Sequence, residues 1–287
     1  MVNTSVGRPS SARVSLSLRV QTEVTKEVDM IGAIAGDIIG SRFEFRNTDR
    51  YDFELFTEES SFTDDTICTI AIADAINTGA DYGSKLHEWC QKYPNPMGAY
   101  GGRFAQWVAS DSPEPYESFG NGSAMRVSPV AWAFDELDDV LREAERTAIP
   151  THNHPEGVKG AQAVAHAIHL ARNTKNKSDI IITTDCKYYP MFQSKDYYAG
   201  VFDETCQGTV PVCMKIIGVS TSFEDAIRRA IAWGGDSDTI GAIVGSMAEA
   251  LYGVPNHISH EVFKRLPSDM LEVIDKFYKR LNEKNHE

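Results

Sequence analysis

The segment Gly234-Gly235-Asp236-Ser237-Asp238-Thr239 continues as IGAIVGSMAEAL through residues 240–251, and it is the strongest indication of the fold in this sequence. In this continuation apolar side chains recur at helical spacing, at Ile240, Ile243, Val244, Met247, Ala248 and Leu251. Small residues lie between them and would allow a second helix to approach closely, at Gly241, Ala242, Gly245 and Ser246. We therefore expect a central helix that holds Asp236 and Asp238 rigidly at its start.

Three further segments have the same helical spacing of apolar side chains. Their apolar positions are Ile67, Ile70, Ala71 and Ala75; Val158, Ala161, Val164, Ala165, Ile168 and Ala171; and Ala226, Ile227, Ala230 and Ile231. Only short stretches such as Ile180–Thr184 have the composition of a strand, and no alternation of strands with helices is visible. The sequence therefore predicts one compact all-α domain over residues 30–287.

Long loops are expected at residues 42–62, 93–121 and 185–209, and two of them are rich in aromatic residues. The first has Phe43, Phe45, Tyr51, Phe53 and Phe56, and the last has Tyr188, Tyr189, Phe192, Tyr197, Tyr198 and Phe202. Long loops in a compact domain are often functional, so these rings are candidates to cover a site. The alternative is that they only seal the core.

Composition excludes several classes of protein. The 287 residues include 28 Lys and Arg against 41 Asp and Glu, which gives a formal charge of −13. Bare nucleic acid and anionic membranes need a basic face, so neither is an expected partner. Five cysteines without a CxxC motif argue against a disulfide framework or a zinc site. No apolar run approaches the about 18 residues of a membrane span. We expect a cytoplasmic protein.

Residues 1–29 differ in composition from the rest of the chain. They have three arginines, at Arg8, Arg13 and Arg19, and no acidic residue before Glu23. We interpret this segment as a disordered N-terminal extension, ahead of a domain that begins at Met30. The alternative is an organelle-targeting segment, because such segments are rich in Arg and Ser and poor in acids.

Four aspartates stand at the starts of two predicted helices. In Thr63-Asp64-Asp65-Thr66 the threonine occupies an N-cap position and the acids suit the helix dipole, so capping alone would explain this tetrapeptide. In Gly234–Thr239 the two carboxylates are positioned to converge on one point. Together the motifs offer an all-oxygen ligand set, which is typical of Mg²⁺ or Mn²⁺ rather than zinc. Four carboxylates brought together would also repel one another unless cations neutralised them.

Two more segments are candidates for binding. Phe119-Gly120-Asn121-Gly122-Ser123 leads into Ala124-Met125-Arg126, and a glycine-rich turn before a helix can present N–H groups to an anion. A plain turn is the alternative. In Thr151-His152-Asn153-His154-Pro155-Glu156 the two histidines could bind a metal, but no third soft ligand is near. We expect this segment to begin a helix, with Asn153 or His154 donating hydrogen bonds.

These motifs, taken in order, resemble the ADP-ribosylglycohydrolases. The resemblance rests on MIGAIAGDIIG at residues 30–40 with Glu44, then on TDDT, GNGSAMR, THNHP and GGDSDTIGA, and it extends from about Met30 to Tyr252. The family includes the dinitrogenase reductase-activating glycohydrolases and the ADP-ribosylarginine hydrolases. The resemblance implies an all-α orthogonal helical bundle around a binuclear site for two Mg²⁺, or Mn²⁺, ions. Residues 1–29 have no counterpart in the family, and residues 93–118 match only in part.

The resemblance also implies roles for individual residues. The metal ligands it implies are Thr63, Asp64, Asp65, Asp236, Asp238 and Thr239. Glu44 and Asp65 fall at catalytic positions. The positions that correspond to ADP-ribose binding are Gly120, Asn121, Gly122, Ser123, His152, Asn153 and His154. Adenine is expected to stack on one of the loop aromatics.

The implied activity is removal of ADP-ribose from modified protein side chains, with the N-glycosidic linkage to arginine preferred. A water held by the metals would attack the anomeric carbon, whereas ordinary glycosidases use two carboxylates that flank the bond. The alternatives are hydrolysis of ADP-ribosylserine, O-acetyl-ADP-ribose or poly-ADP-ribose, a catalytically silent ADP-ribose binder, and a two-metal phosphoesterase. The expected partner is an ADP-ribosylated protein or a small ADP-ribose conjugate, and the expected state is a monomer.

Overall fold

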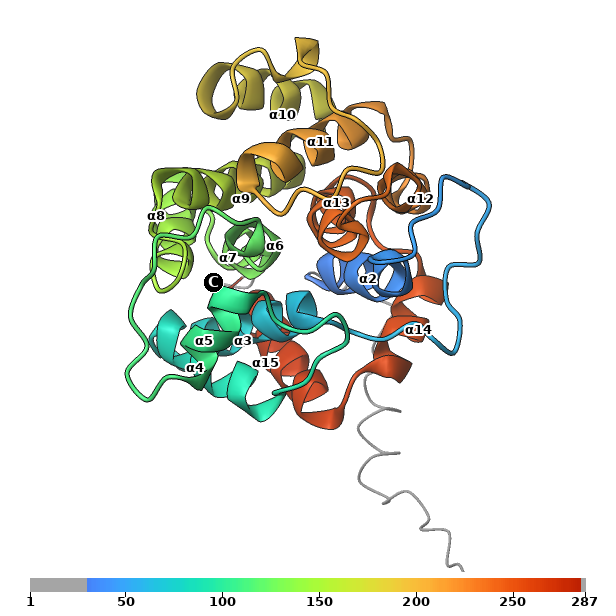
Figure 1. The fold of residues 1–287 in the computed structure, drawn as a ribbon. Coiled ribbons are helices and arrows are strands. Elements are labelled where there is room, and N and C mark those ends of the chain that lie inside the picture. Colours follow the sequence, from blue (N-terminus) through green and yellow to red (C-terminus); the bar gives the residue numbers. More distant parts are fainter. Residues whose placement is uncertain (1–29, 285–287) are drawn as a thin grey trace, which may run out of the picture.

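The computed structural model describes residues 30–284, so the N-terminal extension predicted for residues 1–29 lies outside the described part. The all-α prediction is confirmed. Residues 30–284 form helices and connecting segments without a sheet, and only two isolated β-bridges occur among them, between Thr63 and Met97 and between Gly120 and Thr205. Figure 1 shows α2 and α13 side by side near the middle of the molecule, with α10 and α11 on one side and α3, α4 and α15 on the other.

The helices follow one another with mostly short connections. The first half has α2 (Ile31–Gly40), the 3₁₀-helix η1 (Ser41–Phe43), α3 (Asp64–Thr78), α4 (Tyr82–Lys92), α5 (Gly102–Ala109), α6 (Gly122–Met125), α7 (Ser128–Ala133) and α8 (Leu137–Ala148). The second half has α9 (Pro155–Thr174), α10 (Lys177–Thr183), the π-turn η2 (Thr184–Tyr188), the 3₁₀-helix η3 (Phe192–Ser194), α11 (Cys206–Val219), α12 (Phe223–Trp233), α13 (Ser237–Tyr252), α14 (Asn256–Arg265) and α15 (Ser268–Lys284).

Helices α2 and α13 form the centre of the fold and run antiparallel at backbone contact. A Cβ atom added to Gly36 would overlap the carbonyl of Gly241, and one added to Gly245 would overlap the carbonyl of Gly32. Near the other end, a Cβ on Gly40 would lie 2.6 Å from the Cα of Asp238. The expectation of a central small-residue helix is therefore confirmed, and this contact fixes the start of α13 against the end of α2.

The buried start of α2 obtains its hydrogen bonds from α13. The carboxylate of Glu249 accepts from the backbone N–H groups of Ile31 and Gly32, at 3.0 Å each. The first N–H groups of a helix have no partner within the helix, and leaving them unpaired in the core would be costly. Glu249 thus caps α2 from the partner helix, which reinforces the register of the pair.

The helices predicted from apolar spacing are present as α3, α9, α12 and α13, and their apolar residues belong to one continuous core cluster. Thr63 is the N-cap of α3, as predicted, and its side chain accepts from the N–H of Asp65. The last helix of the four begins at Ser237, with Asp236 at its N-cap position. The acids of both motifs therefore lie at helix starts.

Two local predictions were wrong. Ile180–Thr184 is helical, because Asn176 caps α10 and one face of the helix packs on the core, with Ile180 fully buried and Ile182 60% exposed. Tertiary contacts override the β preference of the isoleucines here. Residues 93–121 are not a continuous loop, because α5 interrupts them and buries Phe104, Trp107 and Val108.

The loop aromatics divide between two roles. Several of them pack on the core, which is the sealing role: Phe43, Phe53, Phe56, Tyr188, Tyr189, Phe192 and Tyr197. Others are exposed: Phe45, Tyr51, Tyr198 and Phe202. Phe45 and Phe202 stack on each other across their two loops, with ring centroids 6.0 Å apart.

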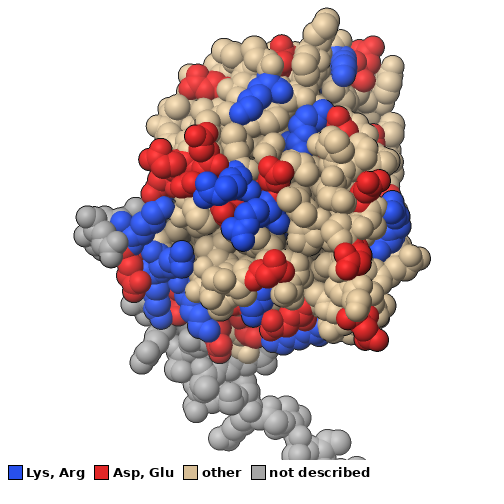
Figure 2. Space-filling model, turned by 90° about the vertical axis from the view of Figure 1, so that its left-hand side faces the viewer, with Lys and Arg blue, Asp and Glu red and all other residues tan. Residues whose placement is uncertain are grey.

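Charges of both signs alternate on the surface that Figure 2 shows, which is the side on which α4 and α8 lie in Figure 1. On α8, ion pairs join Arg142 to Asp139 and Arg146 to Glu143. Among the described helices, none has both the length and the apolar character that a membrane span requires.

Candidate active site

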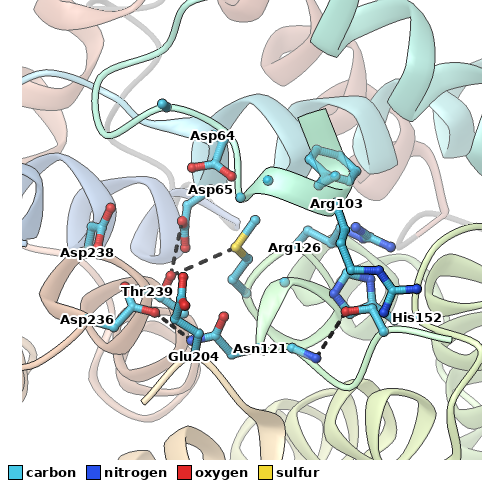
Figure 3. A pocket seen from close by; sticks show the side chains of 18 of the residues that line it. Asp64, Asp65, Arg103, Asn121, Arg126, His152, Glu204, Asp236, Asp238 and Thr239 are labelled. Atoms are coloured by element: carbon cyan, nitrogen blue, oxygen red, sulfur yellow. Dashed lines mark hydrogen bonds between the residues drawn. The ribbon is translucent and has the colours of Figure 1, made fainter. Parts of the chain in front are cut away.

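One pocket collects most of the sequence-predicted site residues, and its two ends differ in charge. Figure 3 shows the carboxylates of α3 and α13 on one side and Arg103, Arg126 and His152 on the other. The cavity has a volume of about 260 Å³. Of the predicted residues, the ones that line it are Glu44, Asp64, Asp65, Gly120, Asn121, Gly122, His152, Asp236, Asp238 and Thr239.

The tightest group of acids comprises Glu44, Asp236 and Asp238. One carboxylate oxygen from each lies within 4.8 Å of the other two. Glu44 follows η1, and the two aspartates lie at the start of α13, so the α2–α13 contact is what brings together residues about 190 positions apart. Asn121 donates to Asp236 Oδ2 at 2.6 Å and fixes that carboxylate from a third segment.

Gly235 shapes the turn before these aspartates. Its φ is +79°, a conformation that favours glycine, and an added Cβ would lie against the carbonyl of Val201. The side chain of Asn47 also bridges the backbone of Gly235, accepting from its N–H and donating to its carbonyl at 2.8 Å each. The turn is therefore held by the loop that follows Glu44.

Asp64 and Asp65 reach the same pocket from the start of α3. Thr239 Oγ1 donates to Asp65 Oδ2 at 3.2 Å, which links the two acidic motifs directly. Asp65 Oδ1 and Asp238 Oδ1 are buried, and neither has a hydrogen-bond partner among the described residues. Buried carboxylate oxygens normally have a donor or a cation beside them.

Asp37 holds the start of α3 in place, a role that was not predicted from the sequence. Its buried carboxylate accepts from the N–H and the hydroxyl of Thr63, at 3.0 and 2.8 Å. It also accepts from the N–H of Thr66, at 3.1 Å, and from the Thr66 hydroxyl. The signal in the sequence was one acid inside an otherwise apolar and glycine-rich helix, since such a residue is rarely buried without partners.

Electrostatics at the acidic end favours a cation. Burial raises the pKa values of Asp64, Asp65 and Asp238 well above the usual range, and neighbouring acids raise them further. Burial, then Asp236, Asp37 and Glu204 raise the pKa of Glu44 to about 7. The oxygen-only donor set and the two unpartnered oxygens fit a hard divalent ion such as Mg²⁺ or Mn²⁺.

Gly98 allows the segment before α5 to close over Glu44. Its φ is +80°, and an added Cβ would lie 2.5 Å from Glu44 Oε2. Glu204 joins the acidic end from the segment before α11, where burial, Asp236 and Asp203 raise its pKa. No sequence pattern indicates a role for Gly98 or Glu204, because only tertiary contact places them beside Glu44 and Asp236.

The other end of the pocket is basic and aromatic. The Arg103 guanidinium lies 4.8 Å from the ring centroid of Tyr116 and donates to the Tyr116 carbonyl. Arg126 is fully buried behind His152. Arg103, Phe104 and Tyr116 were missed because residues 93–118 match the family only in part, so no residue of that loop was assigned a role.

Comparisons with known proteins identify the family. The family model described as ADP-ribosylglycohydrolase matches residues 30–287. The chain belongs to the ADP-ribosylglycohydrolase family. This confirms the resemblance found in the sequence and places the chain among enzymes, the glycosyl hydrolases that act on ADP-ribose linkages.

Curated relatives are similar over most of the chain. ADP-ribosylarginine hydrolase Tri1 of Pseudomonas putida is 25% identical over 260 residues, which cover 78% of this chain and 70% of the relative. ADP-ribosylhydrolase ARH3 of Mus musculus is 25% identical over 306 residues, covering 78% and 83%. ADP-ribosyl-[dinitrogen reductase] glycohydrolase of Rhodospirillum rubrum is 22% identical over 271 residues, covering 85% and 88%.

A solved structure titled ADP-ribosylglycohydrolase-related protein complex has the same fold. It aligns with a TM-score of 0.68 at 21% identity and covers 88% of this chain and 96% of that chain. The all-α ADP-ribosylglycohydrolase fold predicted from the sequence is therefore confirmed.

Four predicted site residues of this ADP-ribosylglycohydrolase lie outside the pocket lining. Thr63 donates its hydroxyl to Asp37 rather than lining the cavity, and Ser123 donates to the carbonyl of Gly157 at 2.7 Å. Asn153 Oδ1 accepts from the N–H of Glu117 at 2.7 Å. His154 caps α9, and its Nδ1 accepts from the N–H of Glu156 at 3.1 Å. Their roles as ligands or binding residues stay predictions.

Two details of the binding segments differ from expectation. Asn153 and His154 accept hydrogen bonds where donation was predicted, because each faces a backbone N–H group. Asn153 faces that of Glu117 in the segment before α6, and His154 faces that of Glu156 in the first turn of α9. The helix at the end of the glycine-rich turn, α6, has only four residues, so its dipole adds little to any anion binding by the N–H groups of the turn.

Proposed function

We propose that the protein is a Mg²⁺-dependent hydrolase that removes ADP-ribose from modified protein side chains, with the arginine linkage as its preferred substrate. The observation that carries the proposal is the charge separation within one pocket. An acidic end built around Glu44, Asp236 and Asp238 faces a basic end with Arg103 and Arg126. ADP-ribose has matching parts, a ribose that metals can bind through its hydroxyls and a diphosphate anion.

The proposed ligands of two Mg²⁺ ions are those that the motifs indicate, Thr63, Asp64, Asp65, Asp236, Asp238 and Thr239. Their support is the oxygen-only donor set and the buried, unpartnered Oδ1 atoms of Asp65 and Asp238. A bound divalent cation supplies Lewis acidity and offsets the charge of the carboxylates. Asn121 and Thr239 orient Asp236 and Asp65 by the hydrogen bonds described above.

Glu44 is proposed as the group that takes and returns the proton. Its carboxylate lies within 4.8 Å of those of Asp236 and Asp238. Burial and the neighbouring acids raise its pKa to about 7 in the metal-free site, and bound cations would lower that value. An acid in this position can exchange a proton with a substrate held at these acids. Gly98 packs against its Oε2 and restricts the approach of bulk water from that side.

The rest of the substrate is proposed to lie along the cavity toward Arg103. The diphosphate would contact the Gly120–Gly122 turn and His152, and adenine would stack on Tyr116 or Phe104, the rings of the cavity lining. The aromatic residues of the loops at 42–62 and 185–209 do not line the cavity, so they are not proposed for this role.

The preference for arginine rests on charge at the leaving-group end. Glu204 adds an acid beside Glu44 and Asp236, and a cationic guanidinium leaving group is favoured there over a neutral hydroxyl. The name of the Pseudomonas putida relative refers to ADP-ribosylarginine, whereas the equally similar mouse relative is named without a linkage.

A product assay tests the proposal. The purified chain with Mg²⁺ is given peptides carrying ADP-ribosylarginine or ADP-ribosylserine, and released products are separated by chromatography. We expect free ADP-ribose, faster from arginine, with loss of activity in EDTA and recovery with Mg²⁺ or Mn²⁺. Cleavage of serine alone would contradict the linkage preference, and release of AMP or phosphate would contradict the reaction.

We also infer that residues 30–287 act as one catalytic domain, and that the protein is a cytoplasmic monomer. Support for one domain comes from the family match over this whole range and from the continuous core. Light scattering of the purified full chain tests the oligomeric state, and a mass near 31.8 kDa is expected.

A further inference from the structure

Arg126 is a buried guanidinium without an acidic partner among residues 30–284. It is 1% exposed, and none of the ion pairs of the described chain involves it. Its Nη2 donates to the carbonyl of Thr147 at 2.9 Å and to the hydroxyl of Thr151 at 2.8 Å. Burying a charged guanidinium without an acidic partner costs free energy, so its burial here calls for a structural or functional reason.

The hydrogen-bond chain continues to the pocket through Thr151. Thr151 Oγ1 lies 2.7 Å from Nδ1 of His152 and is itself fully buried. Arg126 can only donate, so the hydroxyl oxygen is the acceptor in that bond. The hydroxyl hydrogen then has one acceptor among the described residues, which is Nδ1 of His152.

This arrangement favours one tautomer of His152, because a proton on Nδ1 would leave the hydroxyl hydrogen of Thr151 without an acceptor. The hydrogen bond that one ring nitrogen makes determines which nitrogen has the proton. With Nδ1 accepting, the proton of the neutral ring is on Nε2. Burial, and then Arg126, lower the pKa of His152 well below its usual value, so the ring is neutral at physiological pH.

The Nε2 atom faces the glycine turn at the edge of the pocket. A Cβ added to Gly122 would lie 3.1 Å from it, and one added to Gly120 would lie 3.4 Å from it. His152 also lines the cavity, tilted against Tyr116 with ring centroids 6.3 Å apart. The absence of side chains at these glycines leaves Nε2 accessible to an acceptor in the cavity.

We propose that Arg126 and Thr151 are positioning residues that lock His152 with its proton on Nε2, so that it donates a hydrogen bond to a phosphate oxygen of the substrate. The identity of the acceptor rests on the proposed function, but the lock itself does not. A histidine held in this way is a donor that keeps its role through the physiological pH range and adds no second charge beside Arg126.

The decisive variant is Thr151→Val, which keeps the volume and removes the hydroxyl, with Thr151→Ser as the matched control. Long-range ¹H–¹⁵N NMR spectra report which ring nitrogen is protonated, and His152→Asn assigns the signals. We expect protonation on Nε2 in the wild type and in Thr151→Ser, and a loss of this single tautomer in Thr151→Val. Circular dichroism of each variant checks that the helices are intact.

Binding of ADP-ribose, measured by calorimetry, gives the second readout. We expect the dissociation constant to rise about fivefold in Thr151→Val, which corresponds to about 1 kcal/mol, and to stay near wild type in Thr151→Ser. Protonation of Nδ1 in the wild type, or an unchanged tautomer in Thr151→Val, would overturn the lock. Equal affinity of folded Thr151→Val and wild type would overturn the donor role. If the wild type bound no ADP-ribose, the proposed function would fail, while the spectra would still decide the lock.

Discussion

Asp37 determines where the first acidic motif lies, although its own side chain is outside the cavity lining. Four donors from Thr63 and Thr66 converge on its carboxylate, so the start of α3 has one allowed position against α2. Burial raises the pKa of Asp37 to about 6, and the hydrogen bonds from both threonines oppose that rise. Residues of this kind are difficult to recognise in one sequence, because their partners are hydrogen-bond donors in another segment.

Substitution of Glu44 tests its proposed role in proton transfer. Glu44→Gln keeps the shape of the side chain and removes its ability to take a proton. We expect ADP-ribose binding to persist while hydrolysis falls at least about a hundredfold, the usual contribution of an acid–base group. Glu58→Gln, at an exposed position of the following loop, is the matched control. Steady-state rates unchanged by Glu44→Gln would remove this residue from the mechanism.

Among the contacts between helices, the site depends on the packing of α2 against α13. Glycines at the crossing let the two backbones touch, and the same contact places Gly40 against Asp238. Glu44, directly after η1, and the two aspartates at the start of α13 then converge. The positions of the glycines therefore matter to the chemistry as well as to packing.

Gly36→Ala tests this element contact. The added methyl group would overlap the carbonyl of Gly241, and the helices would have to separate. We expect a loss of about 3 kcal/mol in the free energy of unfolding, at the upper end for overpacked cores, together with weaker metal binding. Gly102→Ala is the control, since a Cβ there meets nothing within 4 Å. Equal denaturant midpoints for the two variants would show that the crossing tolerates a side chain.

Asp225 in the first turn of α12 gives a prediction on pH. Burial raises its pKa, but hydrogen bonds from Tyr51, Arg229 and Thr221 outweigh burial and lower the pKa to about 2. Because the folded-state pKa is below the unfolded value, this group stabilises the fold above about pH 4 and loses that effect as the pH falls through 2. Asp225→Asn should reduce stability near neutral pH and differ little from wild type near pH 2. Urea titrations across this range check it, and a difference independent of pH would contradict it.

At the scale of the whole molecule, the pocket concentrates opposite charges at its two ends within a strongly acidic protein. The acidic end is assembled from η1, α3, α13 and the segment before α11, so no single element holds it. Its buried carboxyl groups have raised pKa values and disfavour one another's ionisation. A cation that binds only the folded state would therefore stabilise the entire domain.

Mg²⁺ should accordingly raise the thermal midpoint. At a concentration about a hundred times the dissociation constant, binding adds about 2.7 kcal/mol, or roughly 5–10 °C for a domain of this size. Asp236→Asn should abolish turnover and most of this shift while leaving the helical content near wild type. Differential scanning calorimetry with and without EDTA measures the shift. Normal turnover by Asp236→Asn in metal-free buffer would contradict a metal site at these acids.

The local sequence is enough to predict the helices that hold the site and the acidic residues at their starts. Apolar spacing and an N-cap are local properties, so α3, α9, α12 and α13 could be predicted, as could the acids at the starts of α3 and α13. The order of the motifs was also enough to indicate the family. Such features depend on neighbours a few residues away, which is the range over which a sequence pattern is informative.

Which site residues face one another could be known only from the tertiary structure. Glu44 meets Asp236 and Asp238 because glycines allow α2 and α13 to touch, and Gly98 reaches Glu44 through a loop that has no helical pattern. The link from Arg126 to His152 likewise crosses from one segment to another. These contacts depend on how helices pack at distances of a few ångströms, and the spacing of residues along the chain does not specify such distances.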